Sequence, residues 1–181
     1  LSNFIIEPDF NFSIGQGRID LGFSPYVGYR LWKQLFGGGG VTYFYTGFRY
    51  IAFQDPSGTR TYYANANWHT FGAGVFLQYN IWHGFFARTK FEVLHHRIDD
   101  FYTGNVSVQL NPQTNAYSVI IPKVDKTIPA LLVGVGYNLL QSKYFFFPLM
   151  VSYNLLYTVT DKNYSIYPKG FVVQLGFVNI F

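Results

Sequence analysis

The sequence predicts an all-β fold, an eight-stranded antiparallel up-and-down transmembrane β-barrel, and three observations predict it. Aromatic residues make up 22% of the chain and charged residues only 12%. Hydrophobic residues reach 49%, yet no stretch approaches the run of about 18 apolar residues that a spanning helix needs. Several segments alternate between apolar and polar or small residues, which is the period of a strand. Because backbone groups in lipid must be paired within the protein, only helices and closed barrels can span a bilayer.

The composition also excludes several classes of protein. A chain so aromatic and so poor in charge is not disordered, and 18 glycines with one methionine do not suit a helical bundle. Thirteen basic and nine acidic residues are spread without a Lys/Arg cluster, so we expect no nucleic-acid partner. The absence of cysteine removes disulfides, thiolate metal sites and cysteine nucleophiles. No cofactor is predicted.

Alternation is clearest in four segments. One parity is apolar and faces outward, and the other is polar or small and faces inward. In 20–32 the outward set runs from Leu21 to Leu31, and in 70–80 from Phe71 to Tyr79. The segments 86–93 and 171–177 alternate in the same way.

We expect one domain over 1–181 with eight strands, whose bounds are given at the end of this paragraph and are accurate to a few residues. Short turns are expected near 33–38, where Gly37 to Gly40 lie, at 81–83 and at 140–143, and Gly15 to Arg18 is a further short connection. Longer loops are expected at 55–66, 98–125 and 160–169. Since short turns lie at the periplasmic end of such barrels, an even strand count places both termini there. The expected strands are 3–14, 19–32, 39–54, 67–80, 84–97, 126–139, 144–159 and 170–181.

Aromatic residues near the strand ends predict girdles at the two membrane surfaces. Tyr and Trp prefer the headgroup layer because their rings are apolar and their tips are polar. Three strand ends place an outward Tyr before a turn, in Gly28–Trp32, Gln78–Trp82 and Gly136–Leu140. The predicted girdle consists of Trp32, Trp68, Trp82, Tyr29, Tyr79, Tyr137, Tyr144 and Phe181, with Trp68 in the upper belt.

The segment from Leu21 to Tyr29 and the abundance of Phe and Tyr resemble the OmpA/OmpX-like superfamily of outer-membrane barrels, and most of all the Bacteroidota outer-membrane β-barrel family. The last strand, Phe171 to Phe181, resembles the C-terminal signal read by the barrel-assembly machinery, although Asn179 departs from that pattern. The resemblance implies a bacterial outer-membrane location. It also implies contact with outer-membrane lipid and lipopolysaccharide, and the assembly machinery as a partner during insertion.

The interior of an eight-stranded barrel is just wide enough for side chains to fill it. Inward parity predicts four acidic and four basic residues there, and unpaired charges in so narrow a space would be costly. We therefore expect a salt-bridged plug, whereas an ion pathway would favour a ring of one sign. The predicted interior charge network is Glu7, Asp9, Asp20, Arg30, Arg49, Arg88, Lys90 and Glu92.

No residue pattern predicts an enzyme, and we expect no catalytic or metal site. A serine–histidine lipid deacylase would show His-x-Ser on an outward face, and none of the four histidines is followed by Ser at that spacing. His95 and His96 are the remaining candidates for a lipid-modifying enzyme. Neighbouring strand residues point to opposite faces, so the two cannot bind one zinc ion without a bend.

The 98–125 segment predicts an extended extracellular hairpin with a turn at Asn111 to Asn115. It could add a strand to a partner or merely pack over the barrel mouth. We expect a non-enzymatic barrel with a structural or interaction role, an accessory subunit of a larger outer-membrane complex or a surface-interaction protein. The alternatives are a lipid-modifying enzyme and a narrow pore. The possible partner-binding residues of the hairpin are Val106, Val108, Leu110, Tyr117, Val119 and Ile121.

Overall fold

The regular structure of this chain consists of β-strands throughout the described residues. The computed structural model describes residues 3–15, 17–54, 60–101, 106–111, 113, 116–141, 145–156, 171–175 and 178–180. No helix in this part of the chain is long and apolar enough to cross a membrane. The strands are β1 (Phe4–Gly15), β2 (Arg18–Trp32), β3 (Leu35–Gln54), β4 (Thr61–Trp82), β5 (Phe85–Asp99), β6 (Ser107–Asn111), β7 (Ala116–Ile120), β8 (Lys123–Gln141), β9 (Phe145–Asn154), β10 (Phe171–Leu175) and β11 (Val178–Ile180).

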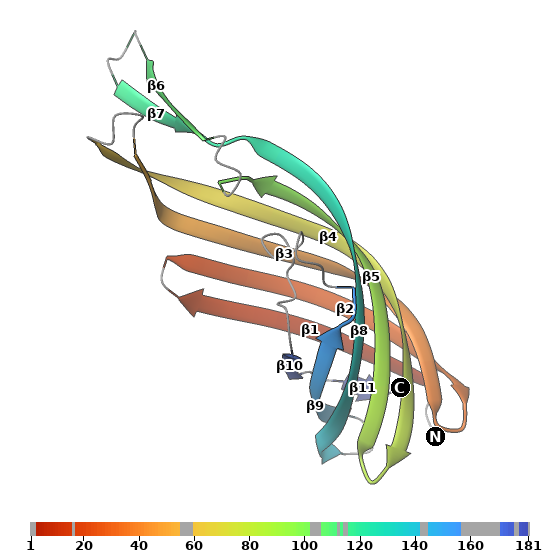
Figure 1. The fold of residues 1–181 in the computed structure, drawn as a ribbon. Coiled ribbons are helices and arrows are strands. Elements are labelled where there is room, and N and C mark those ends of the chain that lie inside the picture. The colour runs from red at the N-terminus through yellow and green to blue at the C-terminus, as the bar shows by residue number, and fades with distance from the viewer. Residues whose placement is uncertain are drawn as a thin grey trace.

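One antiparallel sheet curls around (Figure 1), and the pairing of β11 with β1 closes it into a ring. The strands β1, β2, β3, β4 and β5 pair in that order. β5 then pairs with β8, and β8 pairs with β9. Both β10 and β11 pair with β9, so they act as two segments of one last strand, and Ile180 of β11 lies opposite Ile5 of β1. The ring therefore has eight strands, as predicted. The separate ladder of β6 and β7 is a hairpin inserted between β5 and β8.

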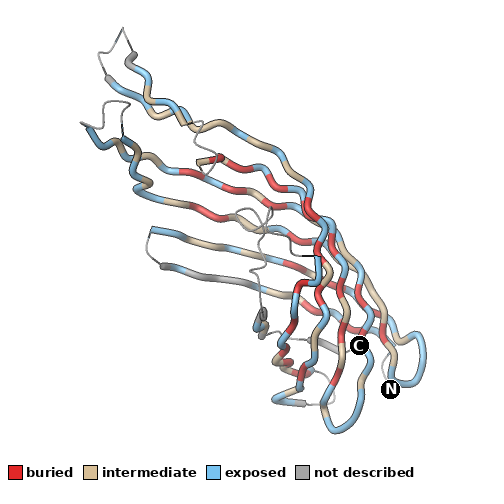
Figure 2. The backbone as a smooth tube through the Cα atoms, viewed as in Figure 1, coloured by how far each residue is buried: buried red, intermediate tan, exposed pale blue. Residues whose placement is uncertain are grey.

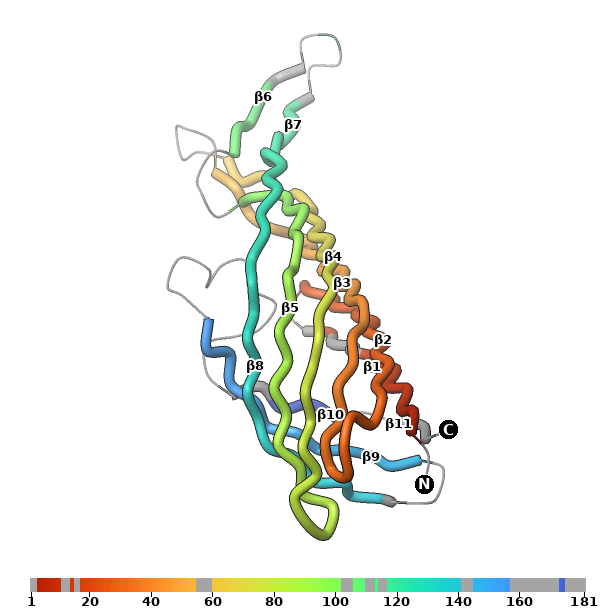
Figure 3. The backbone as a smooth tube through the Cα atoms, turned by 90° about the vertical axis from the view of Figure 1, so that its right-hand side faces the viewer, coloured from red at the N-terminus to blue at the C-terminus, as the bar shows by residue number. Residues whose placement is uncertain are grey.

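The two ends of the barrel differ in how the strands are joined. Residues 33–34 and 83–84 form two-residue turns at the end where the chain termini also lie (Figure 1), and we call this the short-turn end. His83 and Gly84 both have positive φ, the backbone that a two-residue hairpin favours. At the opposite end β3, β4 and β8 extend well past the β1–β2 hairpin, and β6–β7 projects beyond them (Figure 3). We call this the long-strand end.

Side chains alternate between the interior and the exterior as the period of two predicts. Figure 2 shows buried and exposed residues alternating along β4, β5 and β9. Inward apolar residues form three clusters. The first contains Ile5, Tyr26, Phe36, Phe76 and Phe146, the second Leu94, Ala130 and Leu132, and the third Trp68, Ile98 and Ile128 with Phe48 and Phe101 packed against it.

The expected turn at Gly37 to Gly40 is wrong, because these glycines lie inside β3. Gly40 is opposite Tyr26 and Gly38 is opposite Gly28 across the β2–β3 ladder. A methyl group at Gly40 would lie 2.7 Å from the Tyr26 ring, and one at Gly38 would lie 2.7 Å from the Phe76 ring. Glycine is needed at these two positions because the backbone of β2, at the Pro25 and Val27 carbonyl oxygens, and two large inward rings occupy the space that a side chain would fill.

Two strand bounds also differ from the expectation. β4 begins at Thr61, so much of the expected loop at 55–66 is strand. β9 ends at Asn154, with a turn at 155–156, and the remainder of the predicted strand to 159 lies outside the described residues. The longer β4 extends the β3–β4 hairpin past the apolar part of the wall.

Candidate functional site

The charged interior lies between the apolar clusters and joins opposite walls of the barrel. Along the inward side of β5, Arg88, Lys90 and Glu92 follow one another and all three are buried. Arg88 Nη1 donates to both oxygens of Glu7 on β1, at 2.7 and 2.6 Å. Their side chains are only 4% and 7% exposed, so this is a buried ion pair that needs further contacts to offset desolvation.

The second buried pair is built around Glu92. Lys90 Nζ lies 3.2 Å from Glu92 Oε1. The same oxygen accepts hydrogen bonds from the Tyr26 hydroxyl at 2.6 Å and the Thr42 hydroxyl at 2.8 Å. Glu92 is thus held by β2, β3 and its own strand, through charge-assisted contacts to one carboxylate oxygen.

Aromatic rings cover the inward cations. Arg88 lies 4.2 Å from the centroid of the Phe76 ring, and Lys90 lies 4.3 Å from that of Tyr26. Cations over ring faces gain most where they are desolvated, as here. Tyr26 and Phe76, which belong to the apolar cluster at the short-turn end, therefore also support the charges.

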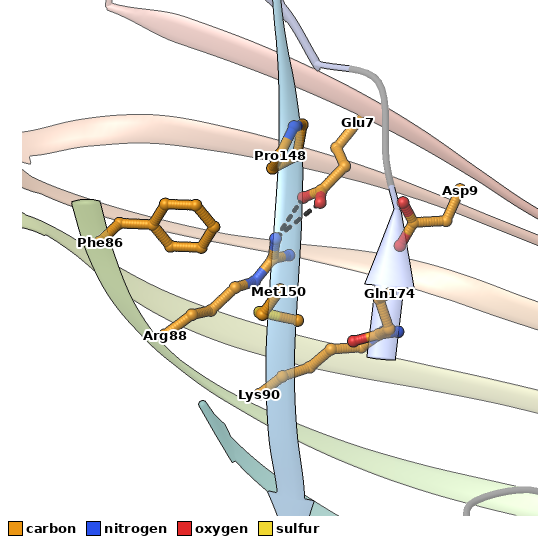
Figure 4. A pocket seen from close by; sticks show the side chains of 8 residues that line it. All are labelled: Glu7, Asp9, Phe86, Arg88, Lys90, Pro148, Met150 and Gln174. Carbon is orange, nitrogen blue, oxygen red and sulfur yellow. Dashed lines mark hydrogen bonds and ion pairs between the residues drawn. The ribbon is translucent and has the colours of Figure 1, made fainter. Parts of the chain in front are cut away.

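Asp9 borders a small cavity beside the Glu7–Arg88 pair (Figure 4). The cavity volume is about 10 Å³, which is room for one water molecule at most. Lys90, Met150 and Gln174 also line it. Glu7, Asp9, Arg88 and Lys90 are therefore brought together in one cluster, as the sequence predicted.

The other predicted interior charges lie toward the ends of the barrel. Asp20 is half-buried and accepts a hydrogen bond from Thr46 Oγ1 at 2.7 Å. It also forms an ion pair with Arg18 at 2.9 Å. Arg30 is half-buried with its guanidinium 5.1 Å from the Phe36 ring centroid. These residues flank the central cluster and are not part of its hydrogen bonding.

The inward placement of Arg49 is wrong, because its side chain is exposed. A bulge in β3 shifts the register between Phe48 and Ile51, so Arg49 and Tyr50 together face the single residue Asn65. Tyr50 has φ of 60°, and its amide donates to Asn65 Oδ1 at 3.4 Å. One extra residue in a bulge reverses the parity of the residues after it, here from Ile51 onward. Arg49 itself shares the parity of Val41 and Tyr43, which are exposed, so consistent use of the period of two would have placed it outside.

The girdle assignment of Trp68 is also wrong, since its side chain is buried inside the barrel mouth. Its ring contacts Phe48 at 4.8 Å and Phe101 at 5.9 Å between centroids. Its indole Nε1 donates to the Asp99 carbonyl at 3.1 Å. Trp68 shares its parity with Thr70, which the alternation places inward, so consistent use of the period of two would have placed it correctly.

The rest of the predicted girdle lies outside, as far as the structure describes it. Trp32 and Trp82 are 72% and 70% exposed at the short-turn end. Tyr29, Tyr79 and Tyr137 are exposed there as well. Tyr144 and Phe181 lie outside the described residues.

The predicted hairpin forms as the two-stranded ladder of β6 and β7. The ring of Tyr117 lies 5.3 Å from that of Tyr62 on β4, and the Arg60 guanidinium lies 5.9 Å from the Tyr117 centroid. The apolar side of the hairpin is therefore turned toward the tip of β4. By register its residues are Val108 opposite Val119 and Leu110 opposite Tyr117, with Val106 and Ile121 just beyond the ladder.

The two adjacent histidines point to opposite sides of β5. His95 is exposed, with Nδ1 3.1 Å from Thr127 Oγ1 and Nε2 3.9 Å from Asp125 Oδ1. His96 is buried, with Nδ1 2.8 Å from Thr70 Oγ1. The described part of the chain contains no group of three His, Cys, Asp or Glu residues placed to hold a metal ion. The geometry therefore does not join the two histidines in one site.

Sequence reasoning missed the uncharged partners of the interior charges. Tyr26 and Thr42, the partners of Glu92, both have inward parity, and the alternation pattern already contained that signal. What it lacked was the cross-barrel distance between strands that are not neighbours.

No protein-family model matches this sequence, and the comparison with curated proteins found no match. Among solved structures, the chain is similar to the N-terminal β-barrel domain of Pseudomonas aeruginosa OprF. The identity is 12% and the TM-score 0.42, with 99% of this chain and 98% of that chain covered. The barrel fold rests on the strand pairing of this chain itself.

Proposed function

We propose that this chain is a sealed, non-enzymatic outer-membrane barrel with a structural or interaction role. The observation that carries the proposal is the pair of buried ion pairs, Glu7 with Arg88 and Lys90 with Glu92, which occupy the middle of the interior. Buried charges that neutralise one another fill space and tie walls together, whereas conduction needs an open path with weakly bound ions.

The outward face supports a membrane location. Along β4 the outward residues from Phe71 to Ile81 are apolar or small, and exposed Trp and Tyr residues follow at the short-turn end. A closed sheet with an apolar band and an aromatic girdle suits the bacterial outer membrane. In this proposal the short-turn end and both termini face the periplasm, and the barrel-assembly machinery inserts the chain.

Reconstitution in planar bilayers tests the sealed interior. We expect no discrete conductance steps from the folded protein, because the two buried ion pairs occupy the middle of the interior and the cavity beside them has room for one water molecule at most. The Glu7→Ala/Arg88→Ala double variant is the matched comparison, since it removes one of the two buried ion pairs without changing the outward face. Regular steps from the unaltered protein would contradict the proposal and favour a narrow pore.

The β6–β7 hairpin is proposed as the contact with another outer-membrane protein. It projects past the barrel wall (Figure 3), and its two strands pair only with each other in the described ladder. Extraction in mild detergent should recover companions with the full chain and lose them when 107–120 is replaced by a short Gly/Ser linker. Equal recovery from both would reject the hairpin as the contact.

A further inference from the structure

The ring of Tyr45 lies along the outer face of β3, over Gly47. A methyl group at Gly47 would lie 2.9 Å from the Tyr45 hydroxyl and 3.3 Å from the ring. The hydroxyl donates to Asn67 Oδ1 at 2.8 Å, and Asn67 is directly opposite Gly47 across the β3–β4 ladder. The glycine thus allows the ring to lie against the sheet with its other face outward.

Two further rings extend this platform. His69 is opposite Tyr45 in register, and their ring centroids are 5.3 Å apart. The Tyr43 hydroxyl lies 3.1 Å from His69 Nδ1. Tyr43, Tyr45 and His69, which we call the aromatic platform, therefore form a connected surface with hydrogen-bonding groups at its edge.

The platform sits at the boundary between apolar and polar outward residues. The cross-strand row on its short-turn side is Val41, Ala73, Val93 and Pro129. The row through the platform is Tyr45, His69, Arg97 and Asp125, with Leu21 beside Tyr45 on β2. Such an abrupt change marks where the acyl chains of a leaflet end and its headgroups begin.

A cation lies one strand from the platform. Arg97 is opposite His69, and its side chain is 66% exposed. Its Nε is directed to Asp125 Oδ1 at 3.3 Å. A guanidinium has five donors in a planar fork, so the terminal nitrogens of Arg97 are available for a phosphate at the height of the headgroups.

We propose that the aromatic platform and Arg97 bind the sugar-phosphate headgroup of a glycolipid in the leaflet at the long-strand end. The apolar face of a sugar ring packs on an aromatic ring, and its hydroxyls bond to polar groups at the ring edge. Asn67 and His69 supply those groups, Arg97 meets the phosphate, and Leu21 and Phe71 contact the acyl chains. This inference rests on the proposed outer-membrane location but not on the sealed interior.

The opposite end of the barrel offers a matched control. Tyr79 is an outward tyrosine whose hydroxyl donates to Gln34 Oε1 at 2.8 Å, as that of Tyr45 does to Asn67. The residues opposite Tyr79 on the two neighbouring strands are Leu35 and Ala87. At the same positions of the platform row, His69 on β4 has Tyr45 and Arg97 opposite it. Tyr79 thus shares the general membrane-anchoring role of an interfacial tyrosine without the proposed platform.

The test uses the full chain in mild detergent with lipid A, and with phosphatidylglycerol as a sugar-free lipid that carries a phosphate. Binding is measured by native mass spectrometry. We expect Tyr45→Ala to weaken lipid A binding by about tenfold, with phosphatidylglycerol unchanged. Tyr45→Phe keeps the ring and should retain most of the binding, Arg97→Gln should weaken both lipids, and Tyr79→Ala should change neither.

Three results would overturn the inference. They are unchanged lipid A binding in Tyr45→Ala, an equal loss in Tyr45→Ala and Tyr79→Ala, or a loss in Tyr45→Ala that is the same for both lipids. Gel mobility before and after heating confirms that each variant is folded. The two proposals can fail separately. If the unaltered protein conducts in bilayers but Tyr45→Ala still weakens lipid A binding, the sealed interior is rejected and the lipid site is retained.

Discussion

Glu7 of β1 and Arg88 of β5 form a 2.6 Å ion pair although 81 residues separate them in the sequence. β1 and β5 are four strands apart in either direction around the closed sheet. The pair therefore spans the barrel between opposite walls. It requires that the ring be closed at the register observed.

Removing one partner of this pair should destabilise the barrel strongly. Glu7→Ala leaves the Arg88 guanidinium buried without its carboxylate, at a cost of about 3–5 kcal/mol. Urea unfolding in lipid vesicles measures it. Glu7→Leu combined with Arg88→Met should recover much of the loss, and Asp125→Asn, in an exposed pair, should cost under about 1 kcal/mol. A Glu7→Ala protein as stable as the unaltered one would show that the pair is not closed in the membrane.

The Tyr26 hydroxyl should contribute to stability through Glu92. Tyr26→Phe removes the 2.6 Å hydrogen bond to the carboxylate and should lower the free energy of unfolding by about 1.5–3 kcal/mol. Tyr29→Phe is the control, since Tyr29 is outward and exposed. Equal effects of the two variants would contradict the role given to Glu92.

Alanine at the consecutive glycines of β3 should have effects that alternate. At Gly40 the new methyl would lie 2.7 Å from the Tyr26 ring, and such overpacking costs about 1–3 kcal/mol. At Gly39, which faces outward, the nearest atom is a carbonyl oxygen at 3.2 Å. The folded fraction on unheated gels should fall for Gly40→Ala and change little for Gly39→Ala. A larger fall in the folded fraction for Gly39→Ala than for Gly40→Ala would mean that Gly39 faces the interior and Gly40 the exterior.

Tryptophans at the two ends of the barrel should differ in their effect on stability. Trp68→Ala leaves a cavity beside Phe48 and Phe101 and should cost about 3–5 kcal/mol. Trp82→Ala removes an exposed ring and should change unfolding much less. Thermal unfolding in one detergent compares them directly. A larger loss of stability in Trp82→Ala than in Trp68→Ala would contradict the buried position of Trp68.

The amino-acid sequence was sufficient to predict the barrel architecture, because side chains in a barrel strand alternate between the two faces with a period of two residues. The apolar run from Phe71 to Tyr79 and the inward run from Phe86 to Glu92 each define both faces of their strand. The same parity was enough to place Arg88, Lys90 and Glu92 inside, and the hairpin around Asn111 to Asn115 followed from its turn composition.

The alternation pattern of one strand does not predict features that depend on residues of neighbouring strands. The bulge at Arg49 and Tyr50 reverses the parity of β3 from Ile51 onward, and it is seen only against Asn65 on the neighbouring strand. Gly37 to Gly40 have the composition of a turn, yet all four lie within β3, where the rings of Phe76 and Tyr26 from other strands lie against Gly38 and Gly40.

Local pattern thus predicted a charge-poor antiparallel barrel and most of the side chains that enter it, with Arg49 and Trp68 as the exceptions. Closure of the ring established which of those side chains meet, Glu7 with Arg88 and Tyr26 with Glu92. The physical reason is that strand period depends on neighbours along the chain, whereas cross-barrel distances depend on strand number, register and the volume of rings from the opposite wall.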